Sequence, residues 1–263
     1  MVVASVELDI LEDHIAEFHR LDDGESSISA LVRKIRTDAV ERRHRNSLNA
    51  ISSDDFDLRI GDCREMLADI ADNSIPLIMT DPPYGNEAEP LYEWLAQFAA
   101  RVLIPGGSLI CYTGQGTIFR DGNIFLKHLK YNWLCEMRHH NSQKMFGAGV
   151  QCTFKPILWF VKDHRRADAS GFRTLMPDSV RSTPDKNEHA WGQGTGGVHQ
   201  WIHRLTEPGE MIVDPFAGTA EWGLISCVAG RKWTGCDLVE GGTTTIEAGD
   251  YDVEYEALDE AAE

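Results

Sequence analysis

The sequence predicts an α/β fold with a mostly parallel, doubly wound sheet. Two apolar runs, at 75–79 and 211–213, have the length of buried strands, and each leads into an Asp-Pro step at which the chain must turn. A helical pattern over 91–102 then leads into a strand at 108–113, which is the strand-helix-strand order of a parallel sheet. With 263 residues, 42% of them hydrophobic, the chain can bury the core of one such domain.

Residues 1–53 predict an N-terminal helical arm. Apolar residues recur at helical spacing from Ile28 to Ala39, and Arg42-Arg43-His44-Arg45 follows, which indicates an amphipathic helix with a basic end. Such a helix either lies on a nucleic acid or packs on the protein with its bases in solvent, and the second interpretation is slightly favoured. Ser52-Ser53 marks a boundary, and we expect the globular domain to span 54–239.

The domain begins with a strand followed by Gly61-Asp62-Cys63, where the glycine permits a tight turn and Asp62 caps a helix. A turn is expected at 104–107, and a long loop over 163–198, which is rich in Gly, Ser, Pro and Asp. The pattern as a whole predicts strands at 56–60, 75–79, 108–113, 133–137, 156–161, 211–213 and 233–236, and helices at 91–102, 118–129 and 222–229.

The net charge of −17 argues against a nucleic-acid partner, because phosphate contacts need clustered Lys and Arg, but the charge is unevenly distributed. Segment 127–173 carries nine bases and three acids, and segment 33–45 carries six bases and two acids. Segment 207–263 instead carries fourteen acids and two bases, and we expect the acidic end, 240–263, to be a disordered tail. This asymmetry fits a basic working face on an acidic body; a solvated surface without a partner is the alternative.

No run approaches the ~18 apolar residues of a membrane span, and the acidic N-terminus lacks the basic start of a signal peptide. We therefore expect a cytoplasmic protein. The six cysteines show neither a C-x-x-C pair nor a histidine at ligand spacing, so they are interpreted as reduced core residues and not as metal ligands.

The first candidate site is Asp81-Pro82-Pro83-Tyr84, which follows a predicted strand and so lies where open α/β sheets bind ligands. The Asp81 carboxylate and the Pro82 carbonyl are two acceptors, suited to the two hydrogens of an exocyclic amine. The Tyr84 ring can stack on the flat ring that bears this amine. A Pro-Pro loop capped by an aspartate, without chemistry, is the alternative for so short a motif.

The second candidate site is Asp214-Pro215-Phe216-Ala217-Gly218-Thr219, again at a strand end. Gly218 would let a ligand approach the backbone, and the helix that follows offers free N–H groups. Asp237 ends the next strand, at the place where dinucleotide-binding folds put an acid on ribose hydroxyls. We expect Asp214 and Asp237 to lie in solvent-facing turns.

The order of the two motifs resembles a known family. Asp81-Pro82-Pro83-Tyr84 stands 133 positions before Asp214, as in the amino-methylating DNA methyltransferases of the permuted "beta" order, in which the catalytic motif precedes the cofactor motif. The resemblance covers about 56–237 and implies a Rossmann-like, S-adenosylmethionine-dependent methyltransferase fold with circularly permuted motifs. Segment 180–193 is further similar to phage and prophage orphan methylases related to ParB-fused forms.

The resemblance implies S-adenosyl-L-methionine as cofactor, double-stranded DNA as partner and the N6 amine of adenine as target. It places Asp62 near the adenine of the cofactor and Asp237 on the ribose, and it suggests that 127–193 faces the DNA. The catalytic residues that it implies are Asp81, Pro82, Pro83 and Tyr84. The cofactor-binding residues that it implies are Asp62, Cys63, Asp81, Gln193, Asp214, Pro215, Phe216, Gly218, Thr219 and Asp237.

One departure from the family lies after Thr219, where Ala220-Glu221-Trp222 replaces further small residues and puts a bulky ring and a carboxylate beside the cofactor's own carboxylate. Two other functions therefore stay open. One is a methyltransferase for another amine, such as cytosine N4, where the family more often has Ser in place of Asp81, or an RNA base. The other is a catalytically silent DNA-binding relative. The recognised DNA sequence and homodimerisation, which is common among relatives, are not decided by the sequence.

Overall fold

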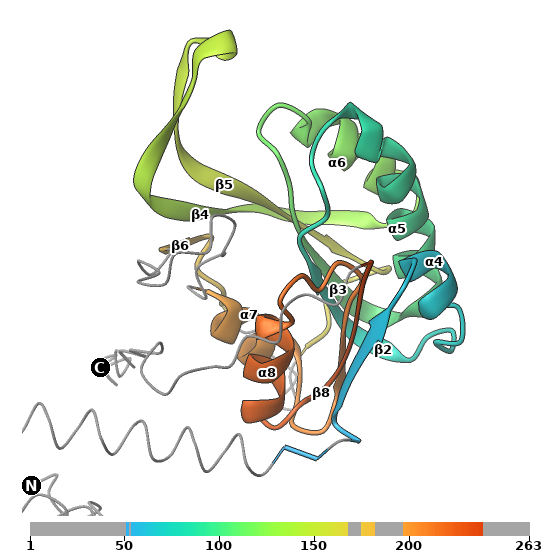
Figure 1. The fold of residues 1–263 in the computed structure, drawn as a ribbon. Coiled ribbons are helices and arrows are strands. Elements are labelled where there is room, and N and C mark those ends of the chain that lie inside the picture. The colour runs from blue at the N-terminus through green and yellow to red at the C-terminus, as the bar shows by residue number, and fades with distance from the viewer. Residues whose placement is uncertain (1–50, 53, 168–174, 182–196, 239–263) are drawn as a thin grey trace, which may run out of the picture. The chain divides into compact units, whose positions relative to one another are not determined.

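Eight strands form one mixed sheet in the part of the chain that the structure describes (Figure 1). The structure is a computed structural model, and it describes residues 51–52, 54–167, 175–181 and 197–238. The strand order across the sheet is β1-β8-β7-β2-β3-β5-β4-β6. The strands are β1 (Phe56–Ile60), β2 (Ile75–Thr80), β3 (Leu103–Tyr112), β4 (Lys130–Met145), β5 (Val150–Val161), β6 (Ser179–Arg181), β7 (Met211–Asp214) and β8 (Lys232–Asp237).

Strands β2 and β7 are parallel neighbours, and the order in which the chain adds strands to the sheet reverses between them. From β2 the chain passes through α5 (Glu89–Val102) to β3 on one side, and from β7 through α8 (Glu221–Val228) to β8 on the other. Because crossovers between parallel strands are right-handed, these opposite directions put α5 and α8 on opposite faces. The prediction of a mostly parallel, doubly wound sheet is confirmed, and ligands of such sheets bind at the carboxyl ends of the strands where the direction reverses.

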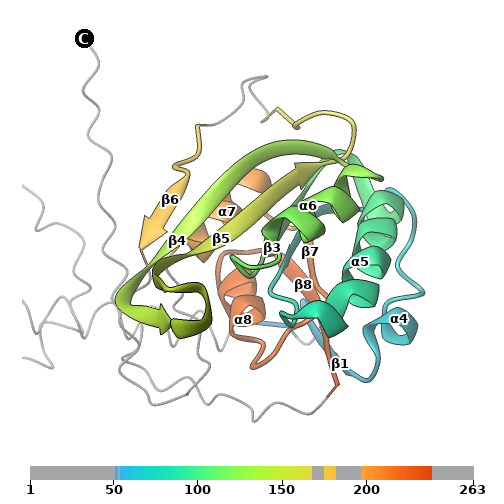
Figure 2. The same cartoon turned by 90° about the horizontal axis from the view of Figure 1, so that it is seen from above.

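Helices cover both faces of the sheet (Figure 2). On one face lie α4 (Cys63–Met66), α5 and α6 (Ile118–Leu126), and on the other lie α7 (Val198–Leu205) and α8. The first face is closed by aliphatic and aromatic side chains: Leu95 of α5 and Phe125 of α6 are fully buried with Leu109 of β3 in one cluster. Each such side chain removed from water stabilises the fold by about 1.5–3 kcal/mol.

Aromatic rings close the second face. The Trp201 ring of α7 meets Trp159 of β5 edge-on, with ring centroids 5.8 Å apart. Trp222 of α8 packs against Tyr112, the last residue of β3, with ring centroids 5.1 Å apart. This second contact ties the start of α8 to the strand end next to β2, so the two candidate motifs share one packed layer.

Strands β4 and β5 form an antiparallel hairpin that reaches beyond the rest of the sheet, with the short helix η2 (Phe146–Ala148) at its end (Figure 1). The strands predicted at 133–137 and 156–161 are confirmed as its inner part. The outer part was not predicted. Residues 144–145 and 150–151 are exposed, so they lack the apolar alternation that a half-buried strand shows.

The other strands lie where they were predicted, within a residue or two, except around Gly106. The turn predicted at 104–107 belongs to β3, because the Gly106 N–H donates to the Lys162 carbonyl at 2.8 Å and the Lys162 N–H donates to the Gly107 carbonyl at 3.0 Å. Helix α6 ends at Leu126, three residues earlier than predicted. Helix α7 and strand β6, which lies inside the predicted loop 163–198, were missed.

The predicted arm at 1–53 lies outside the described residues up to Ala50, and so does the acidic tail from 239 onward, so these domain predictions stay predictions. The cysteines, all described, are free thiols; Cys63, Cys111, Cys135 and Cys236 are buried, and the other two are partly buried. Within the described ranges, no helix is long and apolar enough to cross a membrane.

Gly235 of β8 is expected to be indispensable for packing. A Cβ atom built there would lie 2.1 Å from the indole ring of the fully buried Trp233. Gly235→Ala should therefore destabilise the fold by about 1–3 kcal/mol, as overpacking does. Gly122→Ala in α6 is the matched control: its Cβ would meet nothing within 4 Å, and it should stabilise the helix by about 0.5–1 kcal/mol. Urea unfolding of both variants measures this, and equal effects would contradict the packing account.

Candidate active site

The carboxyl ends of β1, β8, β7 and β2 lie along one edge of the sheet, because these four strands are parallel neighbours. Hydrogen bonds link their ends directly. The Thr80 hydroxyl donates to the Asp214 carboxylate at 2.6 Å, and the Gly61 N–H donates to the Asp237 carbonyl at 2.8 Å. The structure thereby brings together predicted residues that are up to 175 positions apart in the chain, from Asp62 to Asp237.

Asp81 lies just beyond β2, and its polar partners include Tyr84 and Lys155. The Tyr84 hydroxyl donates to Oδ1 of Asp81, and the Lys155 ammonium donates to Oδ2 at 2.9 Å. The side chains of Lys155 and Asp81 are only 11% and 15% exposed, so solvent screens this ion pair weakly. Asp81 and Tyr84 were predicted to act together, and the structure places them in direct contact.

Lys155 is the residue of this site that the sequence analysis did not identify. It lies on β5, next to β3, and its ammonium stands 4.8 Å from the centre of the Tyr84 ring and 5.5 Å from that of Tyr112. Burial lowers the pKa of Lys155, and the Asp81 carboxylate opposes this effect. No motif points to Lys155; the available signal is a lone lysine at the start of an apolar strand run.

The Tyr84 ring is 38% exposed, although its hydroxyl turns inward to Asp81. Burial, followed by the nearby Asp81 carboxylate, raises the pKa of Tyr84, so the phenol keeps its proton and acts as a donor. A partly exposed aromatic residue beside a carboxylate suits a flat, amine-bearing ligand. Of the two prolines between them, Pro82 is buried and Pro83 is exposed.

The loop that carries Tyr84 is held from α6. Gly85 has a φ of 117°, a backbone conformation that residues with a Cβ atom rarely adopt, so this position favours glycine. The Arg120 guanidinium donates to the Gly85 carbonyl at 2.8 Å and pairs with the fully buried Asp121 carboxylate. Asp121 also accepts from the Thr117 hydroxyl at 2.8 Å. These contacts fix the loop and so the direction of the Tyr84 ring.

Asp214 differs from the prediction: it is 2% exposed and does not lie in a solvent-facing turn. The prediction was wrong because Thr80 and the Phe216 N–H, at 3.1 Å, supply donors that let the carboxyl group be buried. Burial raises the pKa of Asp214 to about 7, against the effect of these two hydrogen bonds. Asp214 therefore holds the turn from its buried side. Phe216 is half-buried, and its ring meets the Trp94 ring edge-on.

Gly218 and Thr219 are the exposed part of the second motif. Gly218 has a φ of 54°, and a Cβ atom there would meet nothing within 4 Å, so its surface is open to a ligand. Its N–H donates to Oδ2 of Asp237 at 2.8 Å, which holds the turn against the end of β8. Trp222, predicted to crowd this region, is instead 7% exposed and packs inward on Tyr112.

Asp62 caps α4 by accepting from the Arg64 N–H at 2.9 Å, and the Arg64 guanidinium lowers the pKa of Asp62 to about 2. The Cys63 side chain is 6% exposed in the hydrophobic core, and burial raises the pKa of its thiol to about 12. Cys63 can therefore offer a ligand only its backbone. Gln193 lies outside the described residues.

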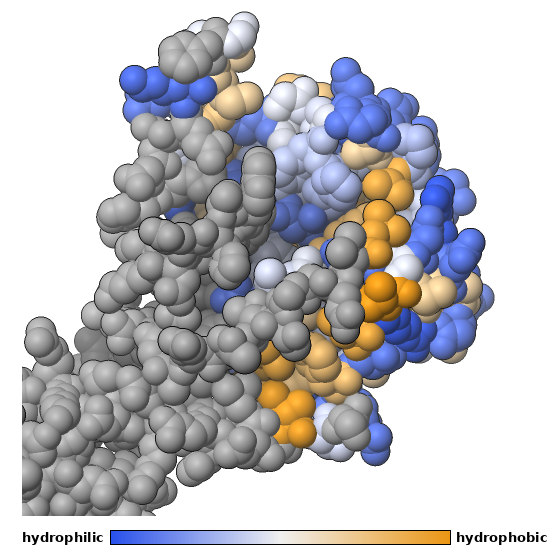
Figure 3. Space-filling view, viewed as in Figure 1, coloured by the Kyte–Doolittle hydropathy of each residue, from blue (hydrophilic) through white to orange (hydrophobic). Residues whose placement is uncertain are grey.

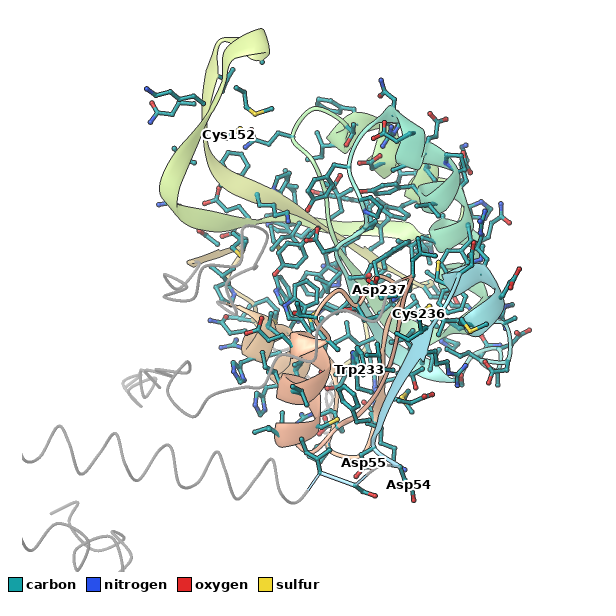
Figure 4. The ribbon with its side chains drawn as sticks, viewed as in Figure 1. Asp54, Asp55, Cys152, Trp233, Cys236 and Asp237 are labelled. Carbon is teal, nitrogen blue, oxygen red and sulfur yellow. The ribbon has the colours of Figure 1, made fainter. Side chains whose placement is uncertain are left out.

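The edge of the sheet at the carboxyl ends of these strands carries both polar and apolar side chains. Asp237 ends β8 far from Asp54 and Asp55, which lie near the start of β1 (Figure 4). Two apolar residues flank the carboxyl ends of these strands, Ile60 at 43% and Leu238 at 73% exposure. The space-filling view shows a band of hydrophobic residues with hydrophilic residues beside it (Figure 3). Carboxylates beside exposed apolar side chains suit a ligand that combines hydroxyls with a flat heterocycle.

No protein-family model matches the chain. Among curated proteins it is similar to the type II methyltransferase M.BamHI of Bacillus amyloliquefaciens, with 22% identity over 68% of this chain and 53% of the relative. It is also similar to the type II methyltransferase M.BglII of Bacillus subtilis, with 24% identity over 68% of this chain and 64% of the relative. The chain thus spans between half and two thirds of the length of these two relatives.

Solved structures show the same fold. The PvuII DNA methyltransferase, described as cytosine-N4-specific, superimposes with a TM-score of 0.57, 20% identity and coverage of 69% of this chain and 81% of that chain. The M1.HpyAVI complex with SAM gives a TM-score of 0.57, 18% identity and coverage of 70% and 94%. The predicted Rossmann-like fold of S-adenosylmethionine-dependent methyltransferases is therefore confirmed.

The buried Asp214 carboxyl should make stability depend on pH. With its pKa raised to about 7, it keeps in the folded state a proton that the unfolded chain releases near pH ~4. Its contribution to stability is therefore full below pH ~4 and is lost as the pH rises through about 7. Asp214→Asn keeps an acceptor for Thr80 but removes this dependence. Relative to the variant, the wild type should lose up to about 4 kcal/mol between pH ~4 and ~8 in urea unfolding; a constant difference would contradict the assignment.

Proposed function

We propose that this protein is an S-adenosylmethionine-dependent DNA methyltransferase that methylates the N6 amine of adenine. The observation that carries the proposal is the pairing of Asp81 with the exposed ring of Tyr84 at the carboxyl end of β2, directly beside β7. A carboxylate acceptor next to an aromatic face suits an amine on a flat ring. The fold and the similarity to type II methyltransferases support the same class of reaction.

The second strand end is the proposed cofactor site. S-adenosylmethionine, when bound, supplies the methyl group. The residues present fit it: Gly218 offers open backbone, and Asp237 ends β8 where a ribose acid is expected. The exposed apolar side chains of Ile60 and Leu238 suit its adenine ring. Asp62 is proposed to contribute at the end of β1.

In the proposed reaction the target adenine leaves the DNA stack, and its ring lies on Tyr84. Asp81 and the Pro82 carbonyl then accept the two N6 hydrogens, which orients the nitrogen lone pair toward the reacting methyl group. The chain contributes position and electrostatics, so no covalent intermediate with a protein nucleophile is needed. The loop contacts of Arg120 and Gly85 keep the Tyr84 ring in place.

The N4 amine of cytosine is the second candidate target. It offers the same two hydrogens on a flat ring, so the contacts of Asp81 and Tyr84 do not distinguish the two bases. Asp81 itself favours adenine, because the family that the sequence resembles more often has Ser at this position in cytosine-N4 enzymes. The nature of the methylated nucleoside decides between them.

Substitutions at Asp81 and Tyr84 test the catalytic half. Asp81→Ala should abolish methyl transfer to DNA, because it removes an amine acceptor. Tyr84→Ala should lose the equivalent of about 1–3 kcal/mol of stacking, roughly 5- to 150-fold in rate, whereas Tyr84→Phe should keep most of the activity. Transfer of radiolabelled methyl to unmethylated duplex DNA, digested to nucleosides, measures this.

The control for this test is Asp72→Ala, an exposed aspartate that precedes β2 at the opposite edge of the sheet and should transfer methyl like the wild type. Label in N4-methylcytosine would change the target base. Full activity of Asp81→Ala would refute the catalytic assignment.

Asp237→Ala tests the cofactor half. The carboxylate holds the Gly218 turn and is proposed to meet the ribose, so its loss should weaken S-adenosylmethionine binding at least tenfold, by about 1.4 kcal/mol or more. Asp54→Ala, at the far end of the sheet (Figure 4), should bind like the wild type. Isothermal titration calorimetry gives the affinities. A wild type that binds no cofactor would support the alternative of a catalytically silent relative.

A further inference from the structure

Lys155 makes the contacts that the proposed function assigns to the target amine. Its ammonium donates to Oδ2 of Asp81 at 2.9 Å and lies over the Tyr84 ring, 4.8 Å from its centre. An adenine or cytosine amine would need the same carboxylate, with its ring on the same aromatic face. Because Asp81 is only 15% exposed and the ammonium already lies on Oδ2, a base amine that takes this position has to displace Lys155 from it.

The backbone on either side of Lys155 is fixed. The Gln115 amide donates to the Phe154 carbonyl at 3.0 Å, and the Thr113 N–H donates to the Pro156 carbonyl at 3.1 Å. The Lys155 side chain therefore starts from a defined point on β5 and can change only its own rotamer. The Tyr112 ring, 5.5 Å from the ammonium, offers a second cation–π position to which Lys155 can move while β5 stays in place.

We propose that Lys155 is a specificity-determining residue that occupies the amine position of the site and that the target base displaces; the proposal rests on the proposed methyl transfer. The base must outcompete the ion pair with Asp81, so only a ring whose amine reaches Asp81 and whose face covers Tyr84 gains enough to enter. The displaced ammonium keeps a cation–π partner in Tyr112, whose ring centre lies 5.5 Å from it in this structure.

The charge of Lys155 should then control the affinity for the substrate. The groups that face the ammonium are Asp81 and Tyr84 from the loop after β2, and Cys111 and Tyr112 from β3. The pKa values of Tyr84, Tyr112 and Cys111 are all raised by burial, so these groups stay neutral while Lys155 loses its proton. Because burial lowers the pKa of Lys155, its competition with the base should weaken at a lower pH than that at which an exposed lysine loses its proton.

The test compares Lys155→Met, Lys155→Arg and the wild type in methyl transfer to unmethylated duplex DNA, with KM for DNA measured from about pH 7 to about pH 10. Lys155→Met keeps the apolar stem and removes the donor. At neutral pH its KM for DNA should therefore be at least threefold lower than that of the wild type. Over the same pH range this KM should change less than the KM of the wild type. The wild-type KM should fall toward that of Lys155→Met as the pH rises. Lys155→Arg, which keeps its charge, should retain the high KM throughout.

Lys162→Met is the matched control, because Lys162 follows the other end of β5 and donates to the Asn73 side chain at 2.7 Å; it should leave KM and its pH dependence unchanged. A KM for Lys155→Met that is unchanged or raised would overturn the inference. A fall in kcat without a change in KM would likewise overturn it and would indicate a structural role for Lys155. Wild-type transfer in the same experiment keeps this outcome separate from failure of the proposed function.

A second measurement requires neither methyl transfer nor a substituted protein that folds. Acetylation of Lys155 by acetic anhydride, followed by peptide mass spectrometry, reports how accessible the ammonium is in the wild-type protein. Adenosine or cytidine at millimolar concentration should change the acetylation rate of Lys155 at least twofold and leave that of Lys162 unchanged. An unaltered rate at Lys155 would overturn the inference even if the protein transferred no methyl group.

Discussion

The hydrogen bond between the Thr80 hydroxyl and the buried Asp214 carboxyl joins the two strands on which the candidate site is built. It closes the junction of β2 and β7, where the chain reverses its path across the sheet and where helices leave toward opposite faces. The Asp81 loop and the Gly218 turn therefore begin from adjacent, rigid strand ends. This constraint keeps the loop proposed to hold the target amine close to the turn proposed to hold the nucleoside of the cofactor.

The junction contains buried ionisable side chains, and neighbouring residues supply the hydrogen-bond partners that their burial requires. Asp214 and Asp121 are almost fully buried, and each is satisfied by hydroxyl donors, while Arg120 also pairs with Asp121. Lys155 is held between Asp81 and two aromatic rings. Such concentration of buried charge is typical of functional sites, because a fold that served only stability would gain more from apolar packing.

The sequence predicts the fold well where buried strands are short and apolar. The strands ending near Asp81, Asp214 and Asp237 were recognised because apolar runs stop at Asp or Pro, and the same signal led to most of the residues of the candidate site. Lys155 was not recognised because its role depends on the pairing of β5 with β3, which no local pattern encodes. The burial of Asp214 was missed for the same reason, since its partner Thr80 lies 134 positions away. The outer part of the β4–β5 hairpin, with exposed residues at 144–145 and 150–151, carries no periodic apolar signal.

The central claim is that the two strand ends together direct methyl transfer to an exocyclic amine in DNA. The most direct measurement is the mapping of modified bases in DNA from a methylation-free bacterial host that expresses the wild-type chain or its Asp81→Ala variant. The account predicts N6-methyladenine in one or a few sequence contexts with the wild type and none with the variant. DNA without any methylated amine in the wild-type host, or equal methylation in both hosts, would contradict it.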